Sequence, residues 1–449
     1  MSTLLDMPND ILLLIICNFL DAPEVLLLRR TCREISQLTR DKIVWLRFLE
    51  RLQNSGEIPL PNSPDTDASL ENIVISAYRA SQLWLKPRQL GKPILNPLGG
   101  RPIKGLNIYL DVWLLIVYAD GFVYLWNIQK DAGHICGTLD LRTDGFRWTS
   151  YSASLDPTNE AIILAIQSIG AMECETRLYS IKLGIDQIFT LIRTFKHPLP
   201  RGILVLDTAR KLVVLASSTQ TLDVIKWDSE EHNMFVPLDD FDDDAEETLF
   251  NTVIALRLLG SHFLAIRTHT IELHLCDDSF QPQRGTKPLK HVLPFPLQDG
   301  AASLSDAVLS AEGRIHVNLL AYDAHSLACY NITIALPTTM AASMEVTLIG
   351  KAPLHILCRT PSFVSAHALG AQGIRAMWVE RNNHTMTRRV RVFAFNRHKA
   401  WHEMDEAFDA FSLKSYDLRE DLTHCALAEL SGNIALANRS GHVFLLPAE

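Results

Sequence analysis

The chain has 449 residues, which leaves room for two or more domains of about 100 to 200 residues each. Its hydrophobic content of 47% and its charged content of 21% are those of an ordinary globular protein. The formal net charge of -9 argues against a general binder of nucleic acid or of anionic membranes, because both would require an excess of Lys and Arg.

Eight cysteines are spread singly along the chain, and none forms a Cys-x-x-Cys pair or stands at zinc-finger spacing from a His. We therefore expect reduced thiols, no bound metal, and a protein of the cytoplasm, the nucleus or both. The apolar run 11–20 is shorter than the roughly 20 residues that cross a bilayer, so no membrane is expected as a partner. Phosphate-binding, dinucleotide-binding and nucleophile-elbow motifs are missing from the sequence, so we expect neither a cofactor nor catalytic residues.

The first 45 residues predict three short helices, and the first of them is apolar on too many sides. One stripe consists of Ile11, Leu12, Ile15, Ile16 and Phe19, and the opposite side carries Leu13, Leu14 and Cys17. A helix that is apolar all round is either buried in a large core or pressed against another surface. Because three short helices cannot supply a large core, the pattern predicts a docking module whose partner is another protein.

The same segment resembles an F-box. The residues that carry the resemblance are, in chain order, Leu5-x-Met7-Pro8-x-Asp10-Ile11-Leu12, Ile15, Phe19-Leu20, Arg30-Thr31-Cys32-Arg33 and Trp45. Met7 stands where the family usually has Leu, and Ile35 stands where many members have Trp, but both residues stay apolar.

The resemblance implies that this module binds a Skp-type adaptor, which would tether it to a cullin–RING ubiquitin ligase. The residues that the resemblance places against the adaptor are Leu5, Met7, Pro8, Ile11, Leu12, Ile15 and Phe19. The alternative interpretation is a helical cap that packs on the rest of the chain, although this leaves the surplus of apolar residues unexplained.

A polar segment with several prolines, residues 55–67, predicts a linker or exposed loop. Residues 68–85 return to helical spacing and end at Lys86-Pro87, and Trp84 is expected to anchor this helix either to the front module or to the rear domain. We therefore predict three parts: an F-box helical module at 1–50, a linker with a connecting helix at 51–90, and a β-domain at 91–449.

The β-domain begins with a clear hairpin pattern. Residues 114–118 and 122–126 alternate around the turn Ala119-Asp120-Gly121, and similar units recur near residues 162–181, 212–227, 263–275, 315–334, 374–395 and 434–446. Seven units at a spacing of roughly 50 residues predict an all-β propeller, most simply with seven blades. Leu125-Trp126-Asn127 and Lys226-Trp227-Asp228 resemble the Trp-Asp end of a WD-repeat blade. Six or eight blades, or a pair of β-sandwiches, remain as alternatives.

The last predicted strand lies at the end of the printed sequence, and a propeller usually closes by joining strands from both ends of its domain. We therefore predict that residues 92–95 or 103–108 complete the last blade. Removal of residues 441–449 should then unfold the whole β-domain.

A basic run between Arg381 and Lys399 contains no acidic residue. Its alternation with Val and Phe is typical of a strand pair with basic rims, but Arg388, Arg389 and Arg391 could also grip an acidic or phosphorylated segment of a client protein.

Together these features favour the substrate receptor of an SCF-type ubiquitin ligase, in which the F-box docks the adaptor and the propeller captures a client. The alternatives are a propeller scaffold that binds the adaptor without directing degradation, and a propeller that binds a small ligand or acts as an enzyme.

Overall fold

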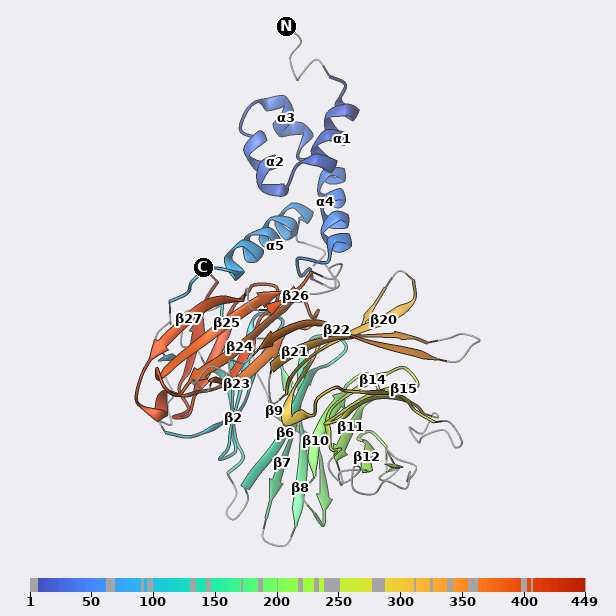
Figure 1. The fold of residues 1–449 in the computed structure, drawn as a ribbon, viewed down its shortest axis with the longest axis vertical. Helices are drawn as coiled ribbons and strands as arrows, with labels where there is room; N and C mark the ends of the chain where they lie inside the picture. Colours follow the sequence, from blue (N-terminus) through green and yellow to red (C-terminus); the bar gives the residue numbers. More distant parts are fainter. Residues whose placement is uncertain are drawn as a thin grey trace.

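The structure is a computed structural model, and Figure 1 shows helices at one end and strands at the other. The residues that it describes are 7–61, 69–89, 93–94, 100–129, 135–142, 147–170, 173–184, 189–199, 201–216, 221–229, 234–237, 251–276, 287–310, 312–323, 326–336, 342–353, 362–396, 402–404 and 407–448.

The helical end consists of five described helices: α1 (Asn9–Phe19), α2 (Ala22–Leu28), α3 (Arg33–Leu38), α4 (Lys42–Ser55) and α5 (Leu70–Trp84). Their boundaries follow ordinary capping chemistry. A capping box of Asp21 and Glu24 starts α2, and Asp41 accepts a hydrogen bond from the Ile43 amide at 2.9 Å at the start of α4. Gly56 ends α4 with φ 58°, a backbone conformation that suits glycine.

One hydrophobic core joins α1, α2, α4 and α5. Val44, Trp45 and Phe48 of α4 form its centre, and Val74 and Ala77 of α5 are buried in it. The fifth helix is therefore part of the helical unit as well as its connection to the β-domain. None of the described helices is long and apolar enough to cross a membrane.

The described strands form seven sheets, which we number as blades in chain order. Blade 1 contains β2 (Ile103–Tyr109), β3 (Trp113–Tyr118), β4 (Phe122–Asn127) and β5 (Ile135–Asp140). Blade 2 contains β6 (Arg147–Leu155), β7 (Ala161–Ile169), β8 (Cys174–Lys182) and β9 (Phe189–His197). Blade 3 contains β10 (Gly202–Asp207), β11 (Leu212–Ala216), β12 (Thr221–Lys226) and β13 (Met234–Pro237). Blade 4 contains β14 (Val253–Leu259), β15 (His262–Arg267), β16 (Thr270–Leu275) and β17 (Leu289–Val292).

Among the described strands, blades 6 and 7 also have four each, whereas blade 5 has six. Blade 5 contains β18 (Leu297–Leu304), β19 (Val308–Leu309), β20 (Arg314–Asp323), β21 (Ser326–Ala335), β22 (Ser343–Pro353) and β26 (His402–Glu403). Blade 6 contains β23 (Ser362–Leu369), β24 (Arg375–Asn382), β25 (Thr387–Ala394) and β27 (Phe408–Lys414). Blade 7 contains β28 (Leu422–Leu427), β29 (Ile434–Asn438), β30 (Val443–Leu446) and β1 (Pro93–Ile94).

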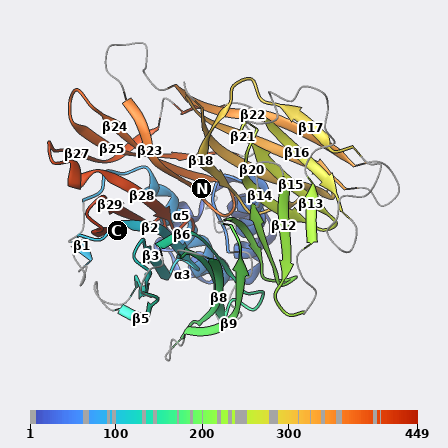
Figure 2. The same ribbon diagram turned by 90° about the horizontal axis from the view of Figure 1, so that it is seen from below.

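The blades form a closed ring. The first strands contact one another in the cycle β2, β6, β10, β14, β18, β23, β28 and back to β2, and the blades follow one another around this ring in Figure 2. The predicted seven-bladed propeller behind a small all-α unit is therefore confirmed, and the alternatives of six or eight blades or a pair of sandwiches are wrong. Each of the seven predicted hairpins contributes two adjacent strands of one blade.

The ring is closed by pairing between distant parts of the sequence. β1 pairs antiparallel with β30, with Pro93 opposite Phe444 and Ile94 opposite Val443. Of the two segments that the sequence left open, residues 92–95 therefore contain the closing strand, whereas residues 103–108 lie in β2, the first strand of blade 1.

Neighbouring blades share their cores through the two-residue period of the strands. In β3, Leu114 and Ile116 pack with side chains of blade 7, whereas Leu115 and Val117 pack with those of blade 2. Both faces of the inner strands are buried for this reason, which explains why residues 113–118 are apolar without interruption.

Candidate functional site

Helix α1 presents apolar side chains on two faces. Leu12, Ile16 and Cys17 are buried, and the last two belong to the core of the helical unit. Four apolar side chains are exposed, and we call them the α1 patch: Met7 (42% exposed), Ile11 (47%), Leu14 (57%) and Phe19 (74%). An exposed apolar cluster of this kind marks a binding surface more often than a single exposed residue does.

The structure separates the residues that the F-box resemblance placed against an adaptor. Leu5 lies outside the described residues; Met7, Pro8, Ile11 and Phe19 are exposed, and Ile15 is half-buried. The prediction for Leu12 is wrong, because its side chain is only 6% exposed. Leu14, which the sequence reading placed on the opposite side of the helix, lies in the α1 patch instead. Its spacing of three residues from Ile11 is the signal that could have identified it.

The carboxyl end of α1 is fixed by an arginine from α4. The Arg51 guanidinium donates hydrogen bonds to the carbonyl oxygens of Cys17 at 2.9 Å and of Leu20 at 2.7 Å. A cation at this position satisfies free carbonyl groups and complements the helix dipole. Arg29 of the segment after α2 forms an ion pair with Glu71 of α5 at 2.6 Å. These contacts hold α1, and with it the α1 patch, in a fixed position within the helical unit.

The helical unit is attached to blades 6 and 7 through the end of α5. Trp84 is 1% exposed and packs with Met377, Val390 and Leu436 in the core between these blades. Its indole nitrogen donates a hydrogen bond to the Phe393 carbonyl oxygen at 3.1 Å. The sequence left open whether Trp84 anchors its helix to the front module or to the rear domain, and the structure places it in the propeller.

Two arginines complete this joint. The Arg88 and Arg375 guanidinium carbons lie 5.2 and 5.1 Å from the centre of the Trp84 ring, within the range of cation–π attraction. Arg88 also donates its backbone amide to Ala410 at 2.7 Å and its side chain to Leu446 at 3.2 Å. Burial lowers the pKa of both arginines to about 10, so both remain charged at neutral pH. We call Trp84, Arg88 and Arg375 the joint cluster.

Arg388 does not lie where a client could reach it. It shares the buried side of β25 with Val390 and Val392 and is only 2% exposed. Its Nε donates a hydrogen bond to Asp421 at 2.8 Å. The prediction that Arg388 grips a client is therefore wrong, because its charge is neutralised inside the propeller.

The other two predicted arginines also meet acids of this chain. Arg391 is mostly buried and pairs with Glu380 at 3.4 Å and with Asp409 at 3.3 Å. Arg389 is half-exposed and lies 3.8 Å from Asp409. All three predicted arginines thus meet carboxylates of this chain, and of these three only Arg389 keeps substantial access to a partner.

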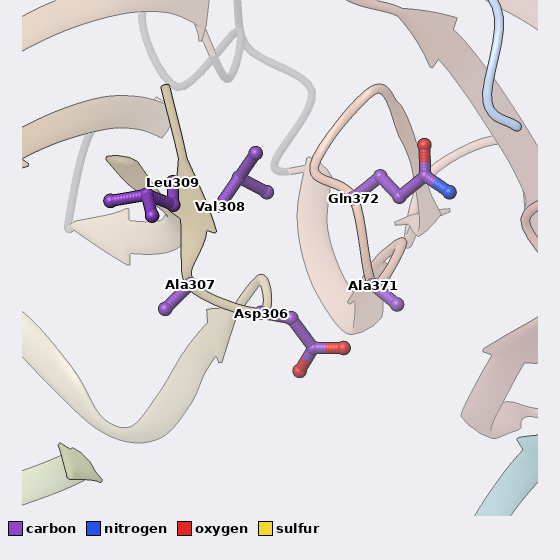
Figure 3. Close-up of a pocket in the computed structure, with 6 residues that line it drawn as sticks. All are labelled: Asp306, Ala307, Val308, Leu309, Ala371 and Gln372. Carbon is purple, nitrogen blue, oxygen red and sulfur yellow. The ribbon is translucent and has the colours of Figure 1, made fainter. Parts of the chain in front are cut away.

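A cavity of about 240 Å³ lies between residues 306–309 and the turn at 371–372 (Figure 3). It is smaller than the roughly 300 to 1,000 Å³ of ordinary ligand pockets. The Asp306 carboxylate beside it already pairs with Arg257 at 2.9 Å. Among the residues that the structure describes, no group of three His, Cys, Asp or Glu side chains is placed to hold a metal ion.

Comparison with known proteins adds little to these observations. No protein-family model and no curated protein matches the chain. Among solved structures, the C-terminal WD40 domain of Sif2 is similar at a TM-score of 0.45 and 11% identity, covering 80% of this chain and 99% of that one. Kluyveromyces lactis Hsv2 is similar at a TM-score of 0.42 and 11% identity, covering 76% and 91%. The propeller assignment rests on the closed ring of blades.

Proposed function

We propose that the protein is the substrate-receptor subunit of an SCF-type cullin–RING ubiquitin ligase. In this proposal the α1 patch docks a Skp-type adaptor, and the propeller captures a client protein. The observation that carries the proposal is the α1 patch itself: a helix whose buried face already packs in the core of its own unit still exposes three large apolar side chains, and Met7, just before the helix, adds a fourth.

The position of the patch supports the same function. Helix α1 lies at the end of the molecule away from the propeller, beyond α4 and α5 (Figure 1). This arrangement argues against α1 as a cap that packs on the propeller, since the end of α5 and Leu60 make those contacts instead.

The joint cluster also fits a receptor, because it fixes the propeller relative to the helical unit. A ligase receptor acts by proximity, so it must hold its client at a defined distance from the adaptor. Trp84 in the propeller core and the Arg29–Glu71 ion pair in the helical unit connect the two binding regions through one helix.

The proposal is tested by the affinity for a purified Skp-type adaptor. We expect the Ile11→Asp/Leu14→Asp variant to bind at least 100-fold more weakly than the unmodified chain, because burying two carboxylates in an apolar interface costs about 3 kcal/mol or more. Its melting temperature should change little, since both side chains are exposed. Isothermal titration calorimetry provides the affinity.

A matched control carries the same charge elsewhere. Leu199 (65% exposed) and Val292 (67% exposed) lie in the propeller, so the Leu199→Asp/Val292→Asp variant, which adds the same two carboxylates, should leave the adaptor affinity unchanged. Equal affinity of the unmodified chain and the Ile11→Asp/Leu14→Asp variant would exclude the α1 patch as the docking site. If adaptor binding depends on the patch but no client accumulates when the patch is mutated in cells, the non-degradative scaffold is the better description.

A further inference from the structure

The loop between β27 and β28, residues 415–421, displays large side chains to solvent. Tyr416 is 75% exposed, Leu418 is 51% exposed, and the Arg419 side chain is 83% exposed. We call this segment the display loop. It lies on the face of the propeller away from the helical unit. The turn at 370–374, just before β24, contacts Leu60 and so lies on the face that carries the helical unit. From there the chain crosses the blade three times, through the antiparallel strands β24, β25 and β27, and residue 415 therefore lies on the opposite face.

Hydrogen bonds from a buried arginine fix the backbone of the display loop. The buried Arg388 side chain donates hydrogen bonds to the carbonyl oxygens of Ser415 at 2.6 Å and of Asp417 at 2.9 Å, and it pairs with Asp421. Asp417 in turn accepts a hydrogen bond from the Arg419 amide at 2.9 Å and starts the short 3-10 helix η3 (Leu418–Glu420). The arginine that the sequence reading assigned to a client therefore organises a loop instead.

A rigid loop with exposed tyrosine and arginine side chains has the composition of a binding hot spot. Tyr and Arg dominate such sites, and a preformed backbone reduces the conformational entropy that binding removes. The Arg419 side chain lies 3.6 Å from the Asp417 carboxylate. The hydrogen bonds that order the loop involve its backbone and the carboxylates of residues 417 and 421, and not the side chains of Tyr416 and Leu418.

We propose that the display loop is a client-docking element for an acidic peptide segment with an aliphatic or aromatic anchor residue. The charges around the loop favour such a partner. Lys414, Arg419 and Arg439 are exposed there, and the two arginines lie 3.6 Å from Asp417 and Asp421, respectively. The Asp421 carboxylate is buried and also pairs with Arg388. The exposed acids of the loop are Asp417 and Glu420, so the three exposed cations outnumber them and leave a positive excess. This inference rests on the proposed receptor function for the fate of the captured protein, but not for its capture.

The test uses a phage-displayed library of random 12-residue peptides, selected on the full-length chain and counted again on its Tyr416→Ala/Leu418→Ala variant. We expect enriched peptides that combine Asp or Glu with an aliphatic or aromatic residue. A synthetic, fluorescein-labelled copy of the most enriched peptide should bind the variant at least tenfold more weakly. Replacing its acidic residues with Lys should abolish binding.

The control is Leu309→Ala, since Leu309 is 69% exposed and lies beside the turn at 371–372, which contacts the helical unit, and it should leave peptide affinity unchanged. Enriched peptides that bind the variant as tightly as the unmodified chain, or that lack acidic residues, would overturn the inference. Because this assay contains no adaptor, its failure is separate from a failure of adaptor binding at the α1 patch.

Discussion

A chain that ends at Ser440 should lose the cooperative unfolding transition of the propeller. The deletion removes β30, which lies between β29 and β1 and is the strand through which the two ends of the domain meet. Val443 and Leu446 are 1% and 0% exposed, and burying each contributes about 1.5 to 3 kcal/mol. Together with the lost strand pairing, this approaches the roughly 5 to 15 kcal/mol by which a folded protein is stable.

Differential scanning calorimetry and near-ultraviolet circular dichroism give the readout. A matched truncation that ends at Pro447 keeps β30 whole and, among the described contacts, removes the hydrogen bond from the Ala448 amide to Asn433, which should cost about 1 kcal/mol. A chain ending at Ser440 that keeps an unchanged transition would show that β30 does not close the ring.

Replacing Trp84 with Ala should destabilise the protein by about 3 to 5 kcal/mol and loosen the joint between its two parts. The indole fills the core between blades 6 and 7 and supports two buried guanidinium groups. Urea unfolding should therefore begin at a lower concentration, and small-angle X-ray scattering should show a larger radius of gyration at native conditions.

Trp84→Phe is the graded control. It keeps an aromatic ring for Arg88 and Arg375 but loses the hydrogen bond to Phe393, so its cost should stay near 1 to 2 kcal/mol, and its scattering curve should match the unmodified chain. If the Trp84→Ala variant unfolds at the same urea concentration as the unmodified chain and has the same radius of gyration, the joint is held by other contacts.

The blades could be predicted from the sequence because their signals are local. Each central hairpin combines alternation or continuous apolarity with a tight turn, as at Asp120-Gly121. The closing strand could only be narrowed to two segments, since the pairing of Pro93 with Phe444 joins residues that are hundreds of positions apart. A two-residue strand leaves almost no pattern of its own.

The candidate sites also depend on contacts between distant parts of the chain, which the sequence does not reveal. A helical wheel separates Ile11 and Leu14 from Leu12 and Ile16, but only the positions of α4 and α5 decide which side is buried. Likewise, the alternation of β25 places Arg388 with Val390 and Val392. Burial of Arg388 is compatible with a stable fold because its guanidinium pairs with Asp421, 33 residues further along the chain. Charge in a sequence is therefore a weak guide to charge at a surface.

In the proposed function, helix α1 uses one face for the core of its own unit and the other face for an adaptor. Hydrogen–deuterium exchange of the full-length chain, with and without a purified Skp-type adaptor, tests it most directly. We expect new protection in residues 9–19 on adaptor binding and no change in the propeller strands β2 to β30. Adaptor binding with unchanged exchange in α1, or with protection confined to the propeller, would contradict it.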